Sequence, residues 1–360
     1  MIYLLAFILV LSIVVVIHEG GHFVVARLCG VQVTDFSLGF GRELIAWTDR
    51  KGTRWKVCLF PLGGYVKMLG DSDAASGKAS ADSLTTEQKK RAFATQPVPK
   101  RMAIVAAGPA MNYIFAIMLL SGIFYFAGDI RIPPVIGQVA ADSVAARAGL
   151  MPQDKIVAIN GKAIDDFSDI QRAVRLTEFG KPLTIRVERA GAPVMVAAQP
   201  DYAQKGTPRL GITSQPDIVV VDKDFGIGQS VAKAARDVWW MTRDTLFYLK
   251  QIITNQRSPE DMRGPLGIAE ASGDALRGGF LSLLVFLVQI SVAVGFMNLL
   301  PIPLLDGGHL AFYLVEGARG KALSEKTQGA LLWGGVSFLL AVVAWTFFLD
   351  VPRIVQRIFG

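Results

Sequence analysis

The chain has 360 residues, of which 52% are hydrophobic and only 19% are charged, and its formal net charge is +7. Together with a mean hydropathy of +0.41, this composition argues against a single soluble domain. In a soluble protein such a positive charge would suggest nucleic-acid binding, but here the basic residues gather between long apolar segments, so no nucleic-acid partner is predicted.

Four apolar stretches are long enough to cross a membrane, which takes about 20 residues in a helix. They run from Ile2 to about Val25, from Ile104 to Gly128, from Phe280 to Leu305 and from Ala330 to Leu349. The first stretch lacks a basic start and a small-residue cleavage site, so it is not predicted to be a signal peptide.

The link between the first two spans, Arg27 to Arg101, contains 13 lysines and arginines. An excess of basic residues marks the cytoplasmic side of a membrane protein. The N- and C-termini and residues 129–279 are therefore predicted to lie outside. Both cysteines, Cys29 and Cys58, fall in the inner link, so the outer segment has no disulfide framework.

The inner link contains a strand-like pattern followed by a polar stretch. "TRWKVCLFPLGGYVKM", ending at Met68, alternates like a strand and is broken by Gly63 and Gly64. It predicts one or more strands with a turn that lie against the membrane. Residues 71–100 are rich in Ser, Ala, Asp and Lys, and they predict a loop with a short helix at most.

The outer segment predicts a compact strand–helix domain. "VIGQV", "DKIVAIN" and "LTIRVER" are typical of strands, "DSVAARAG" and "FSDIQRAVR" of short helices, and Asn160-Gly161 of a turn. Centred on "AARAGLMPQDKIVAINGKAI", this mixture resembles a PDZ domain, a fold that captures an extended peptide by strand addition. A PDZ fold that only spaces or shields is equally compatible.

Residues 226–253 predict an amphipathic helix that follows this domain. Its Trp239 and Trp240 suit a position at the membrane interface. The alternative is that the two tryptophans pack on the outer domain.

Two histidines and a glutamate stand at the end of the first span, in "HEGGH". His18 and His22 are four residues apart, so they lie on one face of a helix and can bind the same metal ion. Glu19 between them can accept a proton from a metal-activated water, as in zinc proteases. Inside a membrane such groups cost about 2.5–3.5 kcal/mol each when unpaired, whereas structural zinc sites yield about 10–16 kcal/mol.

The predicted inner end of the third span contains two candidates for a third metal ligand. The chain has three histidines, and the third, His309, lies in "NLLPIPLLDGGHL" together with Asp306. The predicted topology places this stretch on the same side as "HEGGH". Either residue could complete the site. We favour Asp306, since two nitrogens and one carboxylate are common in zinc hydrolases.

These motifs together resemble the site-2 protease family of intramembrane zinc metalloproteases, and within it the bacterial regulators of the sigma-E type. "HEGGH" (18–22) and "NLLPIPLLDGG" (298–308) match the zinc motifs of that family, and "GGYVKM" (63–68), "AAGPAMN" (106–112) and "GPLGIA" (264–269) match other stretches. The resemblance implies that His18, His22 and Asp306 bind Zn²⁺, that Glu19 is the general base, and that His309 is not a ligand.

The resemblance also implies a reaction and its substrates. The reaction is peptide-bond hydrolysis within or near the transmembrane helix of single-span proteins, such as anti-sigma factors and remnant signal peptides, at the bacterial inner membrane. Gly63, Gly64 and Tyr65 would receive the substrate as an extended strand. Asn298 would position the substrate or polarise its carbonyl, or else pack helices. Well-known relatives carry two PDZ domains, whereas only one is visible here.

The predicted fold is thus a polytopic α-helical membrane protein with four transmembrane helices, a membrane-associated β-element and one extracytoplasmic PDZ (α+β) domain. Membrane lipid and a peptide at the PDZ groove are its further predicted partners. A catalytically inactive PDZ scaffold and an ion-coupled transporter are the alternative functions. The predicted divisions are 1–27 (first span), 28–101 (cytoplasmic loop and β-element), 102–128 (second span), 129–200 (PDZ domain), 201–279 (connector), 280–308 (third span), 309–329 (cytoplasmic link) and 330–360 (fourth span and tail).

Overall fold

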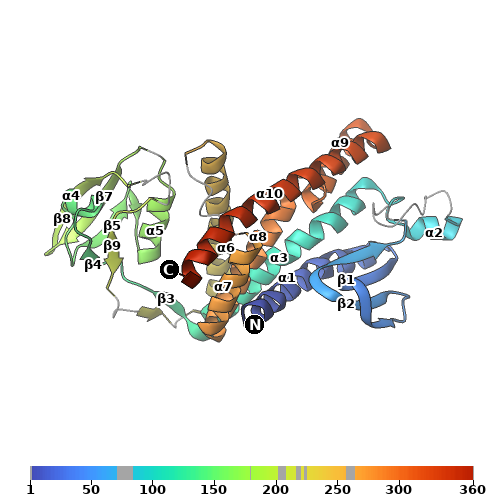
Figure 1. Cartoon of the computed structure of the whole chain (residues 1–360), viewed down its shortest axis with the longest axis horizontal. Coiled ribbons are helices and arrows are strands. Elements are labelled where there is room, and N and C mark those ends of the chain that lie inside the picture. The colour runs from blue at the N-terminus through green and yellow to red at the C-terminus, as the bar shows by residue number, and fades with distance from the viewer. Residues whose placement is uncertain are drawn as a thin grey trace. The chain divides into compact units, whose positions relative to one another are not determined.

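The computed structural model describes residues 2–70, 84–178, 180–201, 208–215, 220–222, 225–256 and 264–359. The chain forms two compact units, which we call the helical unit (residues 1–119 and 263–360) and the mixed unit (residues 120–262). Figure 1 shows their elements in chain order. The first part of the polar stretch predicted as a loop over residues 71–100, namely residues 71–83, lies outside the described ranges.

Four helices are long and apolar enough to cross a membrane, by length and composition. They are α1 (Ile2–Leu28), α3 (Val98–Ala127), α8 (Phe280–Leu299) and α10 (Glu325–Phe359). The predicted number of spans is therefore confirmed for the part of the chain that the structure describes, and the protein is a multi-pass membrane protein.

Helix α10 extends beyond the predicted stretch 330–349 at both ends, and two other helices have ends that differ for a reason visible in the sequence. Helix α8 stops at Leu299, six residues before the predicted end at Leu305. The reason is the pair Pro301 and Pro303, since proline lacks an amide hydrogen and disfavours helical conformation in the residue before it. Helix α3 begins at Val98 and not near residue 102, because Pro99 is well suited to the first turn of a helix.

Small residues bring the helices of the helical unit into close contact. A Cβ atom on Gly21 of α1 would overlap the carbonyl oxygen of Ala107 in α3. In the same way, a Cβ on Gly273 of α7 (Pro265–Arg277) would overlap the Tyr3 ring of α1. Membrane helices gain little from burying apolar surface against each other, because lipid is equally apolar. They associate instead through close packing, which glycine allows.

A β-element packs beside α1. Strands β1 (Val33–Thr48) and β2 (Arg54–Met68) pair antiparallel, and both contact α1. Val33 and Met68, at the base of the pair, are buried together with Ala26 of α1 and Ile104 of α3. The base of the β-element is thus fixed next to the first two spans. The short helix α2 (Thr86–Arg91) follows it.

The mixed unit contains the predicted strand–helix domain. Strands β6 (Lys162–Ala163), β5 (Lys155–Ile159), β7 (Leu183–Arg189) and β8 (Ala192–Ala198) form an antiparallel sheet in that order. The helices are α4 (Val144–Arg147) and α5 (Phe167–Arg175). The strands and helices read from the sequence here are therefore present. Asn160 and Gly161 both have positive φ, as expected for a tight hairpin turn.

The core of the mixed unit extends past residue 200. Strand β4 (Ile136–Val139) pairs with β9 (Ile212–Ser214), and Leu210 belongs to the same buried cluster as Ile136 and Ile156. From the sequence this stretch was predicted to be part of the connector, residues 201–279, and not of the domain. A three-residue strand gives almost no periodic signal, which is why the pattern alone does not reveal it.

The predicted amphipathic helix is α6 (Ile227–Ile253). Trp240 packs beneath the guanidinium groups of Arg172 and Arg243, whereas Trp239 is 66% exposed. Arg172 of α5 also forms an ion pair with Asp244 of α6, 3.0 Å apart. One tryptophan thus packs on the domain and the other faces outward.

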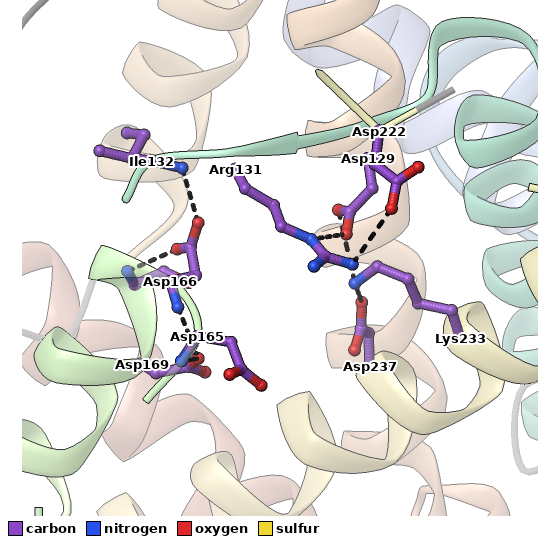
Figure 2. A network of polar contacts seen from close by, with 10 residues as sticks. Asp129, Arg131, Ile132, Asp165, Asp166, Asp169, Asp222, Lys233 and Asp237 are labelled. Carbon is purple, nitrogen blue, oxygen red and sulfur yellow. Dashed lines mark hydrogen bonds and ion pairs between the residues drawn. The ribbon is translucent and has the colours of Figure 1, made fainter. Parts of the chain in front are cut away.

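A polar network joins the start of the mixed unit to α6 (Figure 2). Strand β3 (Asp129–Arg131) pairs with β10 (Val220–Asp222), and Arg131 contacts the carboxylates of Asp129 and Asp222. Lys233 of α6 lies 3.5 Å from Asp129 and 2.9 Å from Asp237. Each of the two cations therefore lies between two carboxylates.

Candidate metal centre

The C-terminal half of α1 directs its two histidines toward one point. The Nε2 atoms of His18 and His22 are 3.3 Å apart, and both face Oδ2 of Asp306, at 3.0 and 3.5 Å. Both imidazoles are buried. The ligand atoms of His18, His22 and Asp306 all lie within 4.8 Å of one another, close enough to hold one metal ion. No other group of three such ligands occurs among the described residues. The structure therefore brings together the three residues predicted as zinc ligands.

The sequence around Asp306 explains how this carboxylate reaches α1. Helix α8 ends before the two prolines, and Asp306 is the first residue of α9 (Asp306–Arg319). Gly307 and Gly308 follow, and a Cβ atom at either position would overlap backbone carbonyl oxygens of residues 299–302. The glycine pair therefore lets α9 fold closely over the loop that precedes it, which sets the direction of the Asp306 side chain.

Helix α9 is fixed from its other end by an ion pair with α3. Arg101 places Nη1 3.1 Å and Nη2 2.5 Å from the two carboxylate oxygens of Glu316. Bidentate pairs of this kind restrict orientation as well as distance. Because both side chains are largely buried, the pair holds α9 in register with α3.

The second nitrogens of the histidines also have partners. His22 Nδ1 lies 2.9 Å from the carbonyl oxygen of Ile104 in α3, which can only accept. His18 Nδ1 lies 3.2 Å from the side-chain amide of Asn112, also in α3. Gly108 lies midway between Ile104 and Asn112 in the sequence of α3, and a Cβ atom there would overlap the His22 ring. One face of α3 thus supports both rings.

Gly108 and Asn112 belong to the "AAGPAMN" stretch, and no role was predicted for either residue from the sequence. Their spacing contained a signal that could have been used. Gly108 and Asn112 are four residues apart and therefore share a helix face. Asn112 is one of only two polar side chains in the apolar core of this span, and a polar residue there usually faces the protein interior.

The donor set fits a zinc ion. Asp306 Oδ2 is buried and has no hydrogen-bond partner among the described residues, although His18 Nε2 lies only 3.0 Å away. An orphaned carboxylate oxygen in an apolar region is costly, and a cation among the three ligand atoms would remove that cost. Two imidazole nitrogens and one carboxylate oxygen are also a known ligand set of catalytic zinc.

The predicted general base lies next to the β-element. The Glu19 carboxylate lies near the backbone of Val66 in β2. A Cβ atom on Gly64 would lie 3.4 Å from Glu19 Cγ and closer still to Val15. A larger residue at 64 would therefore push β2 away from α1. Gly63, with φ of +121°, adopts a backbone conformation that other residues rarely adopt.

Two residues predicted to position the substrate, Tyr65 and Asn298, and the alternative metal ligand, His309, make contacts of their own. Tyr65 accepts a hydrogen bond from Lys56 at 3.3 Å and stacks on Phe40. Asn298 donates its amide to the carbonyl oxygen of Val294 on its own helix, 3.1 Å away, so its substrate role stays a prediction. The His309 ring packs on Phe312 and is not part of the three-ligand cluster.

A large cavity, with a volume of about 920 Å³, lies elsewhere, in the mixed unit between α5, β3 and α6. None of the three candidate ligands lines it, and neither does Glu19. It therefore does not belong to the metal centre.

Comparison with known proteins identifies the family. The profile of peptidase family M50 matches residues 6–342. A putative zinc metalloprotease of Rickettsia conorii is 38% identical, over 95% of this chain and 96% of its own length. Another, of Agrobacterium fabrum, is 35% identical over 98% and 96%. The metalloprotease MmpA of Caulobacter vibrioides is 32% identical over 98% and 96%. With two histidines and an aspartate converging at the ends of apolar helices, the chain belongs to peptidase family M50, the site-2 protease type, and is a zinc metalloprotease.

Proposed function

We propose that this protease cuts single-span membrane proteins within or near their transmembrane helix. The observation that supports the proposal is the meeting of His18, His22 and Asp306. Two of these residues lie in a helix apolar enough to cross a membrane, and the third follows shortly after another such helix. A protease site built there acts on chains that share the membrane with it.

The roles of the residues follow from their positions. His18, His22 and Asp306 would hold the zinc ion, which supplies Lewis acidity that activates a water molecule and polarises the scissile carbonyl. Glu19, adjacent to His18 and near the backbone of Val66, would accept the proton from that water. It then delivers the proton to the leaving amine, as a general base turned acid.

The β-element offers a way to hold the substrate open. A transmembrane helix has its amides tied up in hydrogen bonds and must unwind before it can be cut. Residues Gly64–Met68 pair with β1 on one side, and β1 pairs on its other side with residues 54–57. Among the described strands, the second edge of Gly64–Met68 therefore has no partner strand. An unwound substrate can add to it as a further strand, beside Glu19.

The remaining parts of the proposal concern setting. By charge, the loop of residues 28–101 faces the cytoplasm, and residues 129–279 lie outside the bacterial inner membrane. We infer that single-span anti-sigma factors and remnant signal peptides are its substrates. We further infer that the outer strand–helix domain is a PDZ domain that screens them.

The decisive experiment replaces Glu19. The full chain is co-expressed with a tagged single-span substrate, and cleavage is compared for the native protein, Glu19→Gln and, as a matched control, Glu87→Gln in the exposed helix α2. Glu19→Gln should lower cleavage by about 10²–10⁴-fold while it keeps zinc, and Glu87→Gln should cleave normally. Native-rate cleavage by Glu19→Gln would exclude the assigned role.

A further inference from the structure

Asn112 of α3 is completely buried, and its side-chain amide faces the nitrogen of His18 that points away from Asp306. The distance from Asn112 Nδ2 to His18 Nδ1 is 3.2 Å. The reaction described above gives Asn112 no task. A buried amide inside an apolar span calls for an explanation, because polar groups there are costly unless they are bonded.

The chemistry of His18 shows what it needs at this position. Its Nε2 faces the metal centre, so that nitrogen must carry no hydrogen when a metal is bound. The hydrogen of the neutral ring is then on Nδ1, which becomes a donor and needs an acceptor. His22 meets the same need with the Ile104 carbonyl, 2.9 Å from its Nδ1. For His18 the group in that position is the amide of Asn112.

Only one orientation of this amide satisfies the ring. With Nδ2 toward His18, two donors face each other, and Asn112 Oδ1 is buried without a hydrogen-bond partner in the described structure. The nitrogen and oxygen ends of an amide are nearly identical in shape. Rotating the amide by half a turn brings Oδ1 opposite the Nδ1–H of His18, where it accepts the hydrogen bond. The orphaned oxygen and the unmet donor are thus resolved together.

The backbone of Asn112 is held by a third helix. Ser291 of α8 donates its hydroxyl to the Asn112 carbonyl oxygen at 2.9 Å. Gly295, one turn further on, brings α8 so close that a Cβ atom there would lie 3.2 Å from Asn112 Cβ. Asn112 therefore has little freedom to move away from His18. A side chain fixed in this way can fix the ring that it contacts.

We propose that Asn112 is a positioning residue: its side-chain oxygen accepts the His18 Nδ1–H and keeps the ring in the tautomer whose Nε2 faces the zinc ion. The inference rests on the zinc site proposed above. Outer partners of this kind typically change metal affinity by about 10–100-fold when they are removed. The competing role is helix packing alone, in which the amide acts only as a buried polar contact between spans.

The two roles make opposite predictions for two variants of the full chain in detergent. Asn112→Leu keeps the branched shape of the side chain, although it is larger, and removes the acceptor. Asn112→Asp keeps an acceptor, and a carboxylate accepts Nδ1–H well, but it adds a buried charge. Zinc affinity is measured by competition with a chromogenic chelator. The Co²⁺-substituted proteins are compared by their visible absorption, which reports ligand geometry.

If Asn112 positions His18, Asn112→Leu should weaken zinc binding by about 10–100-fold and shift the cobalt bands, while Asn112→Asp stays within severalfold of the native protein. Ser272→Ala is the matched control, since it removes the hydrogen bond of a buried serine to the Ile268 carbonyl oxygen within α7 and does not touch Asn112. It should lower thermal stability without shifting the cobalt bands.

The opposite ranking overturns the inference: native zinc affinity in Asn112→Leu, or weaker binding in Asn112→Asp than in Asn112→Leu. If Asn112→Leu does not fold, the smaller Asn112→Ala takes its place in the comparison. His18→Asn tests the underlying zinc site separately. If that variant binds zinc like the native protein, the ligand assignment has failed, whatever the Asn112 variants show.

Discussion

Gly108 of α3 lies against the metal-facing nitrogens of both histidines: a Cβ atom there would overlap His22 Nε2 and lie 2.9 Å from His18 Nε2. A glycine in a helix costs roughly 1 kcal/mol relative to alanine. Here the absence of a side chain creates the space in which the two rings and a metal ion fit. The second span therefore forms one wall of the metal centre without providing a ligand.

Replacing Gly108 with alanine should abolish zinc binding and proteolysis, because the added methyl group occupies the space needed by the two rings. The matched control is Gly122→Ala in the same helix, where a Cβ atom meets nothing within 4 Å. That change should leave zinc content unaffected and stabilise the helix by up to about 1 kcal/mol. Zinc is measured by elemental analysis of the purified proteins. Native zinc content in Gly108→Ala would contradict the close packing.

Asp306 and His309 should differ sharply when each is changed to asparagine. Asp306 Oδ2 lies 3.0 and 3.5 Å from the two Nε2 atoms, whereas the His309 ring packs on Phe312. Asp306→Asn should therefore lose zinc and activity, and His309→Asn should keep most of both. The measurement is zinc per protein, together with cleavage of a single-span substrate. A loss of zinc only in His309→Asn would exchange the two assignments.

Local sequence patterns predicted the first half of the metal centre better than the second. The spacing of His18 and His22 fixes their common face, because helical geometry is local. Asp306 was predicted as the third ligand because few ionisable residues lie at the ends of the apolar spans. The pattern missed the end of α8 at Leu299, since apolar character continues past the helix, and only the two prolines mark where it stops.

What could not be predicted are contacts between distant residues. Arg101 and Glu316 are 215 positions apart, and nothing local to either one indicates the other. The same holds for strand β9, whose pairing with β4 depends on a partner more than 70 residues earlier. The contact of Gly108 with the two histidines likewise depends on how α1 and α3 pack. The periodicity of a helix shows which residues share a face, but it does not show which distant residues that face will contact.

The Arg101–Glu316 pair should stabilise the position of α9. Removing one partner leaves the other charged and largely buried, so Arg101→Gln and Glu316→Gln should each cost on the order of 1–3 kcal/mol, between exposed and fully buried pairs. Each should also weaken zinc binding, because Asp306 is the first residue of α9. Unfolding of both single variants and the double variant in a denaturing detergent forms a double-mutant cycle. Strictly additive effects would show that the pair is not coupled.

The Asp154–Arg189 pair predicts how acid affects the mixed unit. Burial by itself would raise the pKa of the Asp154 carboxyl, but hydrogen bonds from Arg189 and from the Met151 amide outweigh it, so its pKa lies below the ordinary value. A lowered pKa in the folded state stabilises the protein above the unfolded-state pKa of about 3.9. This contribution is lost as the pH falls through the folded-state pKa.

Asp154→Asn should therefore be less stable than the native protein at neutral pH, and the difference should shrink once the pH falls below about 4. Scanning calorimetry of both full chains between pH 7 and 3 measures it. A difference that is independent of pH would mean that the carboxylate is not responsible.

Removal of the strand–helix domain of the mixed unit should leave catalysis intact and broaden the choice of substrate. All candidate site residues belong to the helical unit, and the domain contributes none of them. The deletion should span residues 132–214 and not stop at residue 200, because β9 and Leu210 complete the domain core. A shorter deletion would leave an orphaned strand and an exposed apolar surface, and it would test misfolding instead of screening.

A domain that screens substrates acts against those that still carry a bulky outer part, so its loss should permit cutting of an untrimmed single-span protein that the native protease ignores. Trimmed substrate should be cut by both proteins at similar rates. Zinc content and cleavage of matched trimmed and untrimmed substrates are measured together, and Glu19→Gln in the deleted protein serves as the inactive control. If the deleted protein binds zinc but no longer cuts trimmed substrate, the domain delivers substrate to the site and does not exclude it.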